Sequence, residues 1–163
     1  MWSAEFYADS KGKEPCRKWL EKLAEPKRDA LLVALEQVLE RLGPDMCTSE
    51  WGKALGQGLY EFRVRHTAEE TAAMFCGEEP GPKAPEAIVL RVFFHPYGQK
   101  VILLLGGYDK ARDPSESRQQ REIKTARGRL ADFEESSSEL TGSSRRRRPR
   151  SRVDVDAGVK GLT

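Results

Sequence analysis

The spacing of hydrophobic residues predicts helices in the first quarter of the chain. Apolar side chains recur at helical spacing before Gly43-Pro44, at Leu31, Leu35, Val38, Leu39 and Leu42. Pro15 fits the first turn of a shorter helix whose apolar stripe is Trp19, Leu20 and Leu23. Residues 13–42 are therefore predicted to form an antiparallel helical hairpin, preceded by a strand over residues 2–8.

From Leu59 the period changes from 3.6 to 2, which is typical of strands. Residues 59–66, 88–95 and 100–105 are each predicted to form a strand, and Pro96-Tyr97-Gly98-Gln99 supplies a tight turn between the last two. The three strands are expected to form an antiparallel meander, with residues 100–105 in the interior of the sheet because they are almost entirely apolar.

A last helix is predicted after Asp113-Pro114-Ser115-Glu116, where Asp113 is expected to cap the first amides and Glu116 to complete a capping box. Its buried stripe is expected to be Ile123, Ala126, Leu130 and Phe133. The fold class is α+β: an N-terminal strand, a helical hairpin, a three-stranded antiparallel meander and a C-terminal helix.

Two segments fall outside this pattern. Residues 66–87 are rich in Glu, Gly, Pro and Ala and are long for a hairpin connection, so a surface insertion is expected there. Residues 136–163 are rich in Ser and Arg and offer little apolar surface, which predicts a disordered tail. The globular domain is thus expected to span residues 1–135.

The charge is divided unevenly between these parts. Residues 136–163 hold seven Lys/Arg and three Asp/Glu, which leaves 21 basic and 23 acidic residues in 1–135. The folded part is slightly acidic, so any interaction with nucleic acid must depend on where its cations lie. The run Arg145–Arg152 could bind RNA or the ribosome surface non-specifically, or simply keep the chain soluble.

Cysteine usage and apolar runs indicate a cytoplasmic protein. The three cysteines, Cys16, Cys47 and Cys76, have no paired spacing, which suits a reducing compartment. No apolar run is long enough to span a bilayer, and the N-terminus lacks the pattern of a signal peptide. The cysteines and histidines also lack metal-ligand spacing, so neither a metal site nor a cofactor is expected.

An ordered set of short segments resembles the phage-derived, HigB-like branch of the RelE/ParE toxin superfamily. The matching segments cover about residues 5–133 and are 9–15 with Trp19-Leu20, Gly43-Pro44, 53–55, 58–63, 91–94, 103–110, and Pro114 with 121–123 and Ala126. The resemblance implies the toxin of a type II toxin–antitoxin system, neutralised by a small helix-turn-helix antitoxin. Asp109 stands where a second lysine is common in the family, and residues 66–87 are an addition to it.

Two toxin activities are compatible with the resemblance. The RelE and HigB branches imply cleavage of mRNA, typically while it occupies the ribosome. The ParE branch implies inhibition of DNA gyrase with no RNA cleavage. A third alternative is an inactive relic that retains only antitoxin or operator binding.

Candidate catalytic and RNA-binding residues gather on one face of the expected sheet. Metal-independent RNA cleavage needs a proton acceptor, a proton donor and cations around the phosphate. The resemblance points to Lys53, Arg63, Arg91 and Lys110 as catalytic residues, with Arg63 and Arg91 expected to hold the scissile phosphate. The remaining candidates are His95 for proton transfer, because imidazole titrates near neutral pH, and Arg65, Tyr108 and Arg112 for RNA binding.

Each of these residues also has a structural interpretation. Arginines and lysines on a strand commonly form a solvated face, and a lone histidine before a turn is commonly structural. Glu61 could simply pair with a neighbouring arginine. The sequence favours the nuclease slightly, because strand arginines together with Lys53 and an aromatic side chain suit a phosphate better than a protein groove.

Overall fold

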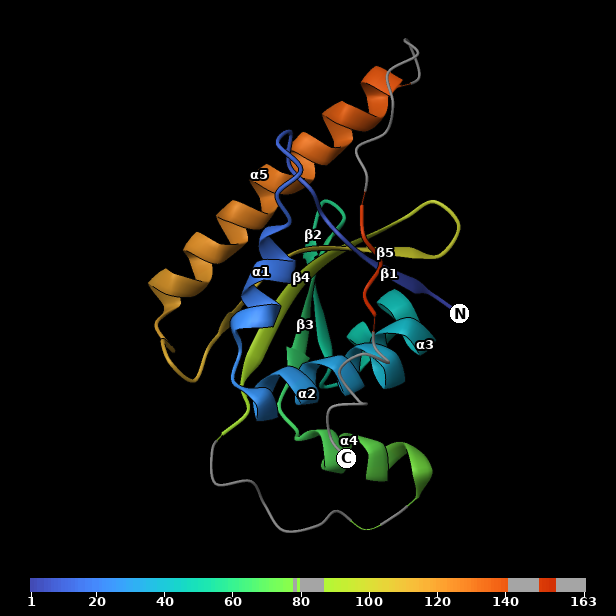
Figure 1. The fold of residues 1–163 in the computed structure, drawn as a ribbon, viewed down its shortest axis with the longest axis vertical. Helices are drawn as coiled ribbons and strands as arrows, with labels where there is room; N and C mark the ends of the chain where they lie inside the picture. The colour runs from blue at the N-terminus through green and yellow to red at the C-terminus, as the bar shows by residue number, and fades with distance from the viewer. Residues whose placement is uncertain (78, 80–86, 141–149, 155–163) are drawn as a thin grey trace.

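The structure is a computed structural model that describes residues 1–77, 79, 87–140 and 150–154 of the chain. A five-stranded mixed sheet, with strand order β1-β5-β4-β3-β2, has helices packed on both faces (Figure 1). The strands are β1 (Ser3–Phe6), β2 (Gly52–Gly56), β3 (Leu59–Val64), β4 (Leu90–Tyr97) and β5 (Val101–Asp109). The α+β class expected from the sequence is confirmed.

The antiparallel meander is also confirmed, and it contains one strand more than expected. Strands β2 to β5 pair in antiparallel succession, and β1 pairs with β5 in parallel. The additional strand is β2. The sequence pattern did not predict it, because residues 52–56 form a short segment without a β-branched side chain. A tight turn joins it to β3, with positive φ angles at Gly56, Gln57 and Gly58. Lys53 therefore lies within the sheet.

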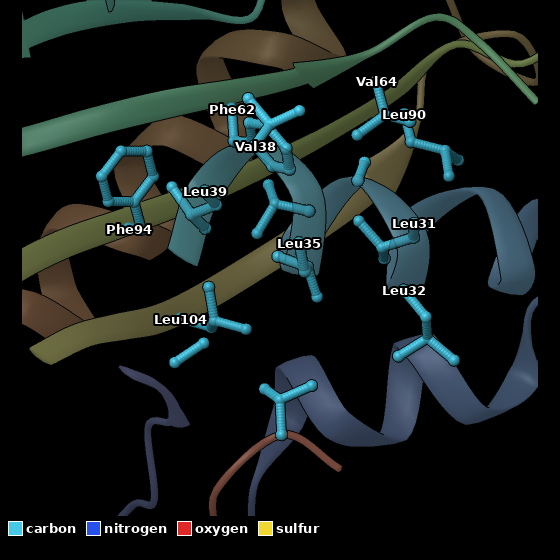
Figure 2. Packing of buried hydrophobic residues seen from close by; sticks show 14 of the residues in the cluster. Leu31, Leu32, Leu35, Val38, Leu39, Phe62, Val64, Leu90, Phe94 and Leu104 are labelled. Carbon is cyan, nitrogen blue, oxygen red and sulfur yellow. The ribbon is translucent and has the colours of Figure 1, made fainter. Parts of the chain in front are cut away.

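The predicted helical hairpin covers one face of the sheet, but its two helices lie at a steep angle to each other and not antiparallel (Figure 1). It consists of α1 (Pro15–Lys22) and α2 (Glu25–Ala34), and α2 continues through a π-helical turn (Leu35–Leu39) into α3 (Glu40–Leu42). Leucines of α2 and the π-helical turn face Phe62, Leu90 and Phe94 of the sheet (Figure 2). This apolar contact holds the hairpin against β3 and β4.

A single long helix, α5 (Glu116–Leu140), covers the other face. Ala126, Leu130 and Phe133 are buried against the sheet, and Ile123 is partly buried, as the hydrophobic stripe predicted. The predicted N-cap residue, Asp113, is wrong by two positions, because Ser115 caps the helix. The Ser115 hydroxyl accepts the Arg118 amide at 3.2 Å, while Asp113 accepts the Ser115 amide, also at 3.2 Å.

The expected surface insertion, residues 66–87, contains a helix. Helix α4 (Ala68–Cys76) begins at a capping box in which the Thr67 hydroxyl accepts the Glu70 amide at 3.1 Å. It packs against α2 and buries Ala68, Thr71 and Ala73. Residues 78 and 80–86 lie outside the described residues. The sequence predicted a surface insertion here but no helix within it, because the capping box at Thr67 was not recognised.

The prediction that residues 136–163 are disordered is wrong for those of them that the structure describes. Helix α5 continues to Leu140, and residues 150–154 lie antiparallel to β1, the edge strand (Figure 1). The Phe6 amide donates to the Ser151 carbonyl at 2.9 Å and the Val153 amide to the Ala4 carbonyl at 3.0 Å. Val153 is buried in the core because the groove beside β1 accepts an apolar side chain. Of the predicted RNA-binding run Arg145–Arg152, residues 145–149 lie outside the described residues and Arg150 Nε lies 3.6 Å from Glu5 Oε2, so RNA binding by the run stays a prediction.

Candidate active site

Arg63, Arg91 and Tyr108 form one row across three neighbouring strands. Arg63 of β3 lies directly opposite Arg91 of β4, and Arg91 lies opposite Tyr108 of β5. Directly opposed residues of an antiparallel pair point to the same face of the sheet. That face is the one α5 covers, because Tyr108 belongs to the apolar cluster under α5. The sequence expectation that the two arginines share a face is met.

Both arginines approach the carboxylate of Glu61, and Lys53 lies opposite it. Arg63 Nε donates to Glu61 Oε1 at 2.8 Å, and Arg91 Nε lies 3.6 Å from the same oxygen. Lys53 of β2 is the cross-strand neighbour of Glu61. We call these five residues, Lys53, Glu61, Arg63, Arg91 and Tyr108, the Glu61 cluster. It contains three cations and one carboxylate, so it carries a net positive charge.

The first turns of α5 cover the centre of the Glu61 cluster. Gln119 Nε2 donates to Glu61 Oε2 at 3.2 Å, and the Arg118 guanidinium lies 5.5 Å from the centroid of the Tyr108 ring. The Glu61 side chain is 0% exposed and that of Arg91 is 4% exposed. Arg63 retains 25% exposure, and Lys53 and Arg65 are exposed. The cluster therefore has a buried centre and a cationic rim.

Among the described residues, two buried donors of this centre have no partner at hydrogen-bond distance, although one of them keeps its 3.6 Å ion-pair contact with Glu61. They are Arg91 Nε and the Tyr108 hydroxyl, which lie on opposed residues of neighbouring strands. Buried polar groups are almost always satisfied, so two unsatisfied donors in one row require an explanation. An anion between them would satisfy both. Burial, reinforced by the Glu61 charge, raises the pKa of Tyr108, which keeps its hydroxyl protonated as a donor.

Lys110 lies in the electrostatic field of the same arginines. Its amide donates to the Val89 carbonyl at 2.8 Å, which fixes the backbone at the end of β5. Desolvation lowers the pKa of the Lys110 ammonium, and the charges of Arg91, Arg63 and Arg65 lower it further, against an opposing effect of Glu61. The neighbouring arginines disfavour the charged form of Lys110, so an anion bound nearby would stabilise that form.

Two predicted site residues lie elsewhere. His95 Nδ1 donates to the Gly58 carbonyl at 2.6 Å, and its ring contacts Phe133 of α5 edge-on. Four residues along β4 separate it from Arg91, a span of about 13 Å. Arg112 lines a cleft beside the turn between α1 and α2. Neither residue is brought to the Glu61 cluster.

Asp109, where the sequence resemblance leads one to expect a lysine, forms an ion pair with helix α2. It accepts Lys27 Nζ of α2 at 2.6 Å, and both side chains are at most 12% exposed. The ion pair joins the end of β5 to the helical hairpin. A lysine at position 109 would face Lys27 instead and repel it, which gives a physical reason for an aspartate at this position.

The roles of Gln119 and Arg118 were not foreseen from the sequence. Both contact the Glu61 cluster from a helix that begins more than 50 residues after Glu61. Their only sequence signal is their position in the first turn of α5, which does not reveal the face of the sheet on which that turn lies. The sequence did leave open that Glu61 pairs with a neighbouring arginine, which in the structure is Arg63.

Comparison of the chain with known protein families and with curated protein sequences gave no match. Within the described residues, no group of three or more His, Cys, Asp or Glu side chains could hold a metal ion. None of the helices in that part of the chain is both long and apolar enough to cross a bilayer.

Proposed function

We propose that the chain is an RNA-cleaving toxin of a type II toxin–antitoxin system, of the RelE/HigB kind, that acts in the cytoplasm on translated mRNA. The observation that carries the proposal is the pair of unsatisfied donors, Arg91 Nε and the Tyr108 hydroxyl, behind a rim of cations. A phosphodiester supplies the acceptor oxygens these donors lack. A small helix-turn-helix antitoxin is the partner we expect.

The reaction this site suits is cleavage of RNA by its own 2′-hydroxyl. The 2′-oxygen gives its proton to a water molecule and attacks phosphorus, the bond from phosphorus to the 5′-oxygen breaks, and the 5′-oxygen gains a proton. The products are a 2′,3′-cyclic phosphate and a 5′-hydroxyl. Arg63 and Lys53 stabilise the extra negative charge on phosphorus, and Tyr108 or Lys110 supplies the proton to the 5′-oxygen.

Access to the buried centre requires the first turns of α5 to move. Arg63 and Lys53 can contact a phosphate from solvent, whereas Arg91 and Tyr108 lie beneath Arg118 and Gln119. The contact between Gln119 and Glu61 is a single hydrogen bond, so its loss costs about 1 kcal/mol, or up to about 3 kcal/mol because the acceptor is charged. RNA binding is able to offset a cost of that size.

The burial of Arg91 favours one alternative, a gyrase-inhibiting toxin that binds protein and cleaves nothing. In that case the Glu61 cluster only holds β3, β4 and α5 together.

Expression of the chain without an antitoxin separates these activities. The nuclease predicts growth arrest with discrete mRNA breaks detected by primer extension, and normal plasmid supercoiling. Arrest with intact transcripts and lost gyrase activity would establish the alternative, and unimpaired growth would indicate an inactive relic.

A further inference from the structure

A cleft of about 530 Å³ lies beside the candidate active site, where the turn between α1 and α2 meets the connection from β5 to α5. Its walls have two different characters. The apolar wall is Trp19, Leu23 and Ala24, and the cationic wall is Lys22, Lys27, Arg112 and Arg118. Among the described residues that line the cleft, Asp109 is the single acidic one, and it is paired with Lys27.

Two cations of the cleft remain available to a ligand. Arg118 is paired with Glu122 at 2.8 Å and lies 3.8 Å from Asp113, so its charge is largely compensated. Lys22 and Arg112 have no ion-pair partner among the described residues, and both are exposed. The cleft therefore presents two uncompensated positive charges beside an aromatic side chain.

Trp19 is fixed in position by the backbone beneath it. A Cβ atom at Gly107 of β5 would lie 2.4 Å from Trp19 Cζ3, so the indole packs directly on the glycine. The side chain is half-buried and still lines the cleft. Proteins that bind single-stranded nucleic acids commonly place a rigid aromatic side chain next to cations, because bases stack on the ring while phosphates contact Lys and Arg.

Arg118 connects the cleft to the Glu61 cluster. It lines the cleft and also lies over the Tyr108 ring. A strand of RNA whose phosphate meets Arg63 and Lys110 could thus continue across this part of the chain.

We infer that the cleft lined by Trp19, Lys22 and Arg112 binds a nucleotide of single-stranded RNA next to the one that is cleaved, with its base against Trp19 and its phosphate on Lys22 and Arg112. The placement of this nucleotide next to the cleaved one rests on the proposed function. Binding of RNA in the cleft does not itself require cleavage. It also gives Arg112 an RNA contact distinct from the Glu61 cluster.

The test uses an RNA oligonucleotide with 2′-O-methyl groups throughout, which binds but has no attacking hydroxyl. Binding to the full chain is measured at several salt concentrations for K22Q/R112Q and for a control, K18Q/K124Q. The control removes the same charge from exposed positions outside the cleft. The cleft variant is expected to bind roughly tenfold more weakly than the control. Its salt slope should fall by about 0.7, the value for the one phosphate contact that Lys22 and Arg112 share.

A third variant, W19F, tests the aromatic wall. It keeps a ring on Gly107, removes part of the stacking surface, and is expected to weaken binding without changing the salt slope. Equal affinity and slope for K22Q/R112Q and the control would overturn the inference. Failure of the proposed function has a different signature, since unmodified RNA would then stay intact while the cleft variant still bound the modified RNA more weakly.

Discussion

Arg63 and Arg91 are direct cross-strand neighbours, and their Nε atoms lie 2.8 and 3.6 Å from the same oxygen of Glu61. Two guanidinium groups would repel each other at this spacing without the carboxylate between them. Glu61 thus fixes the orientation of both arginines, and Gln119 holds the second carboxylate oxygen. The chemistry proposed above depends on this arrangement.

The first prediction concerns the stability that Glu61 provides. The substitution Glu61→Gln leaves Arg91 buried without a counter-charge, which is expected to lower the free energy of unfolding by about 3 kcal/mol. Urea denaturation measures the change. Glu134→Gln, at an exposed position on α5, is the control and should change stability by less than about 0.5 kcal/mol. Equal stabilities of the two variants would show that Glu61 does not hold the arginines.

The second prediction separates structure from catalysis at His95. His95→Ala removes the hydrogen bond to the Gly58 carbonyl and the contact with Phe133. The free energy of unfolding should fall by about 1–2 kcal/mol. The rate of RNA cleavage per folded molecule should be unchanged, because His95 is far from Arg91. A folded variant with roughly a hundredfold slower cleavage would instead make His95 a proton-transfer group.

The third prediction concerns the effect of low pH on residues 150–154, the tail strand that lies beside β1. Partial burial disfavours ionisation of Glu14, but hydrogen bonds from the Ser151 hydroxyl at 2.5 Å and amide at 3.0 Å, together with Arg17, outweigh it and hold the pKa of Glu14 below its usual 4.5. Because the pKa of Glu14 is lower in the folded state than in the unfolded state, the ionised carboxylate stabilises the docked strand at pH values above the unfolded pKa. That stabilisation is lost as the pH falls through the folded value.

The NMR signals of the Val153 methyl groups report whether the tail strand is docked. Between about pH 6 and about pH 3 they should move toward random-coil positions. In Glu14→Gln this acid transition should be absent, because the titrating group is gone. Glu21→Gln, which removes only an exposed partner of Arg17, should retain it. An unchanged transition in Glu14→Gln would contradict the assignment.

The sequence predicted contacts that follow from local periodicity. Alternation along β3 and β4 places Arg63 and Arg91 on known faces of their strands, and helical spacing identified Ala126 and Leu130 as buried. It did not predict that α5 buries Arg91, because that depends on which sheet face a distant helix covers. Val153 illustrates the same limit: one apolar residue in a polar segment gives no periodic signal, and only the open edge of β1 provides its partner.

Cleavage of a translated mRNA by variants at two positions of the cationic rim tests the proposed site most directly. Lys53→Ala removes an exposed cation and should leave the fold intact, and Arg63→Lys keeps the charge but loses the fork of the guanidinium. Arg41→Ala, an exposed position at the end of α3, is the control. We expect both rim variants to cleave about a hundredfold more slowly than the control. Rates equal to that of Arg41→Ala, with all variants folded, would contradict the assignment of the site.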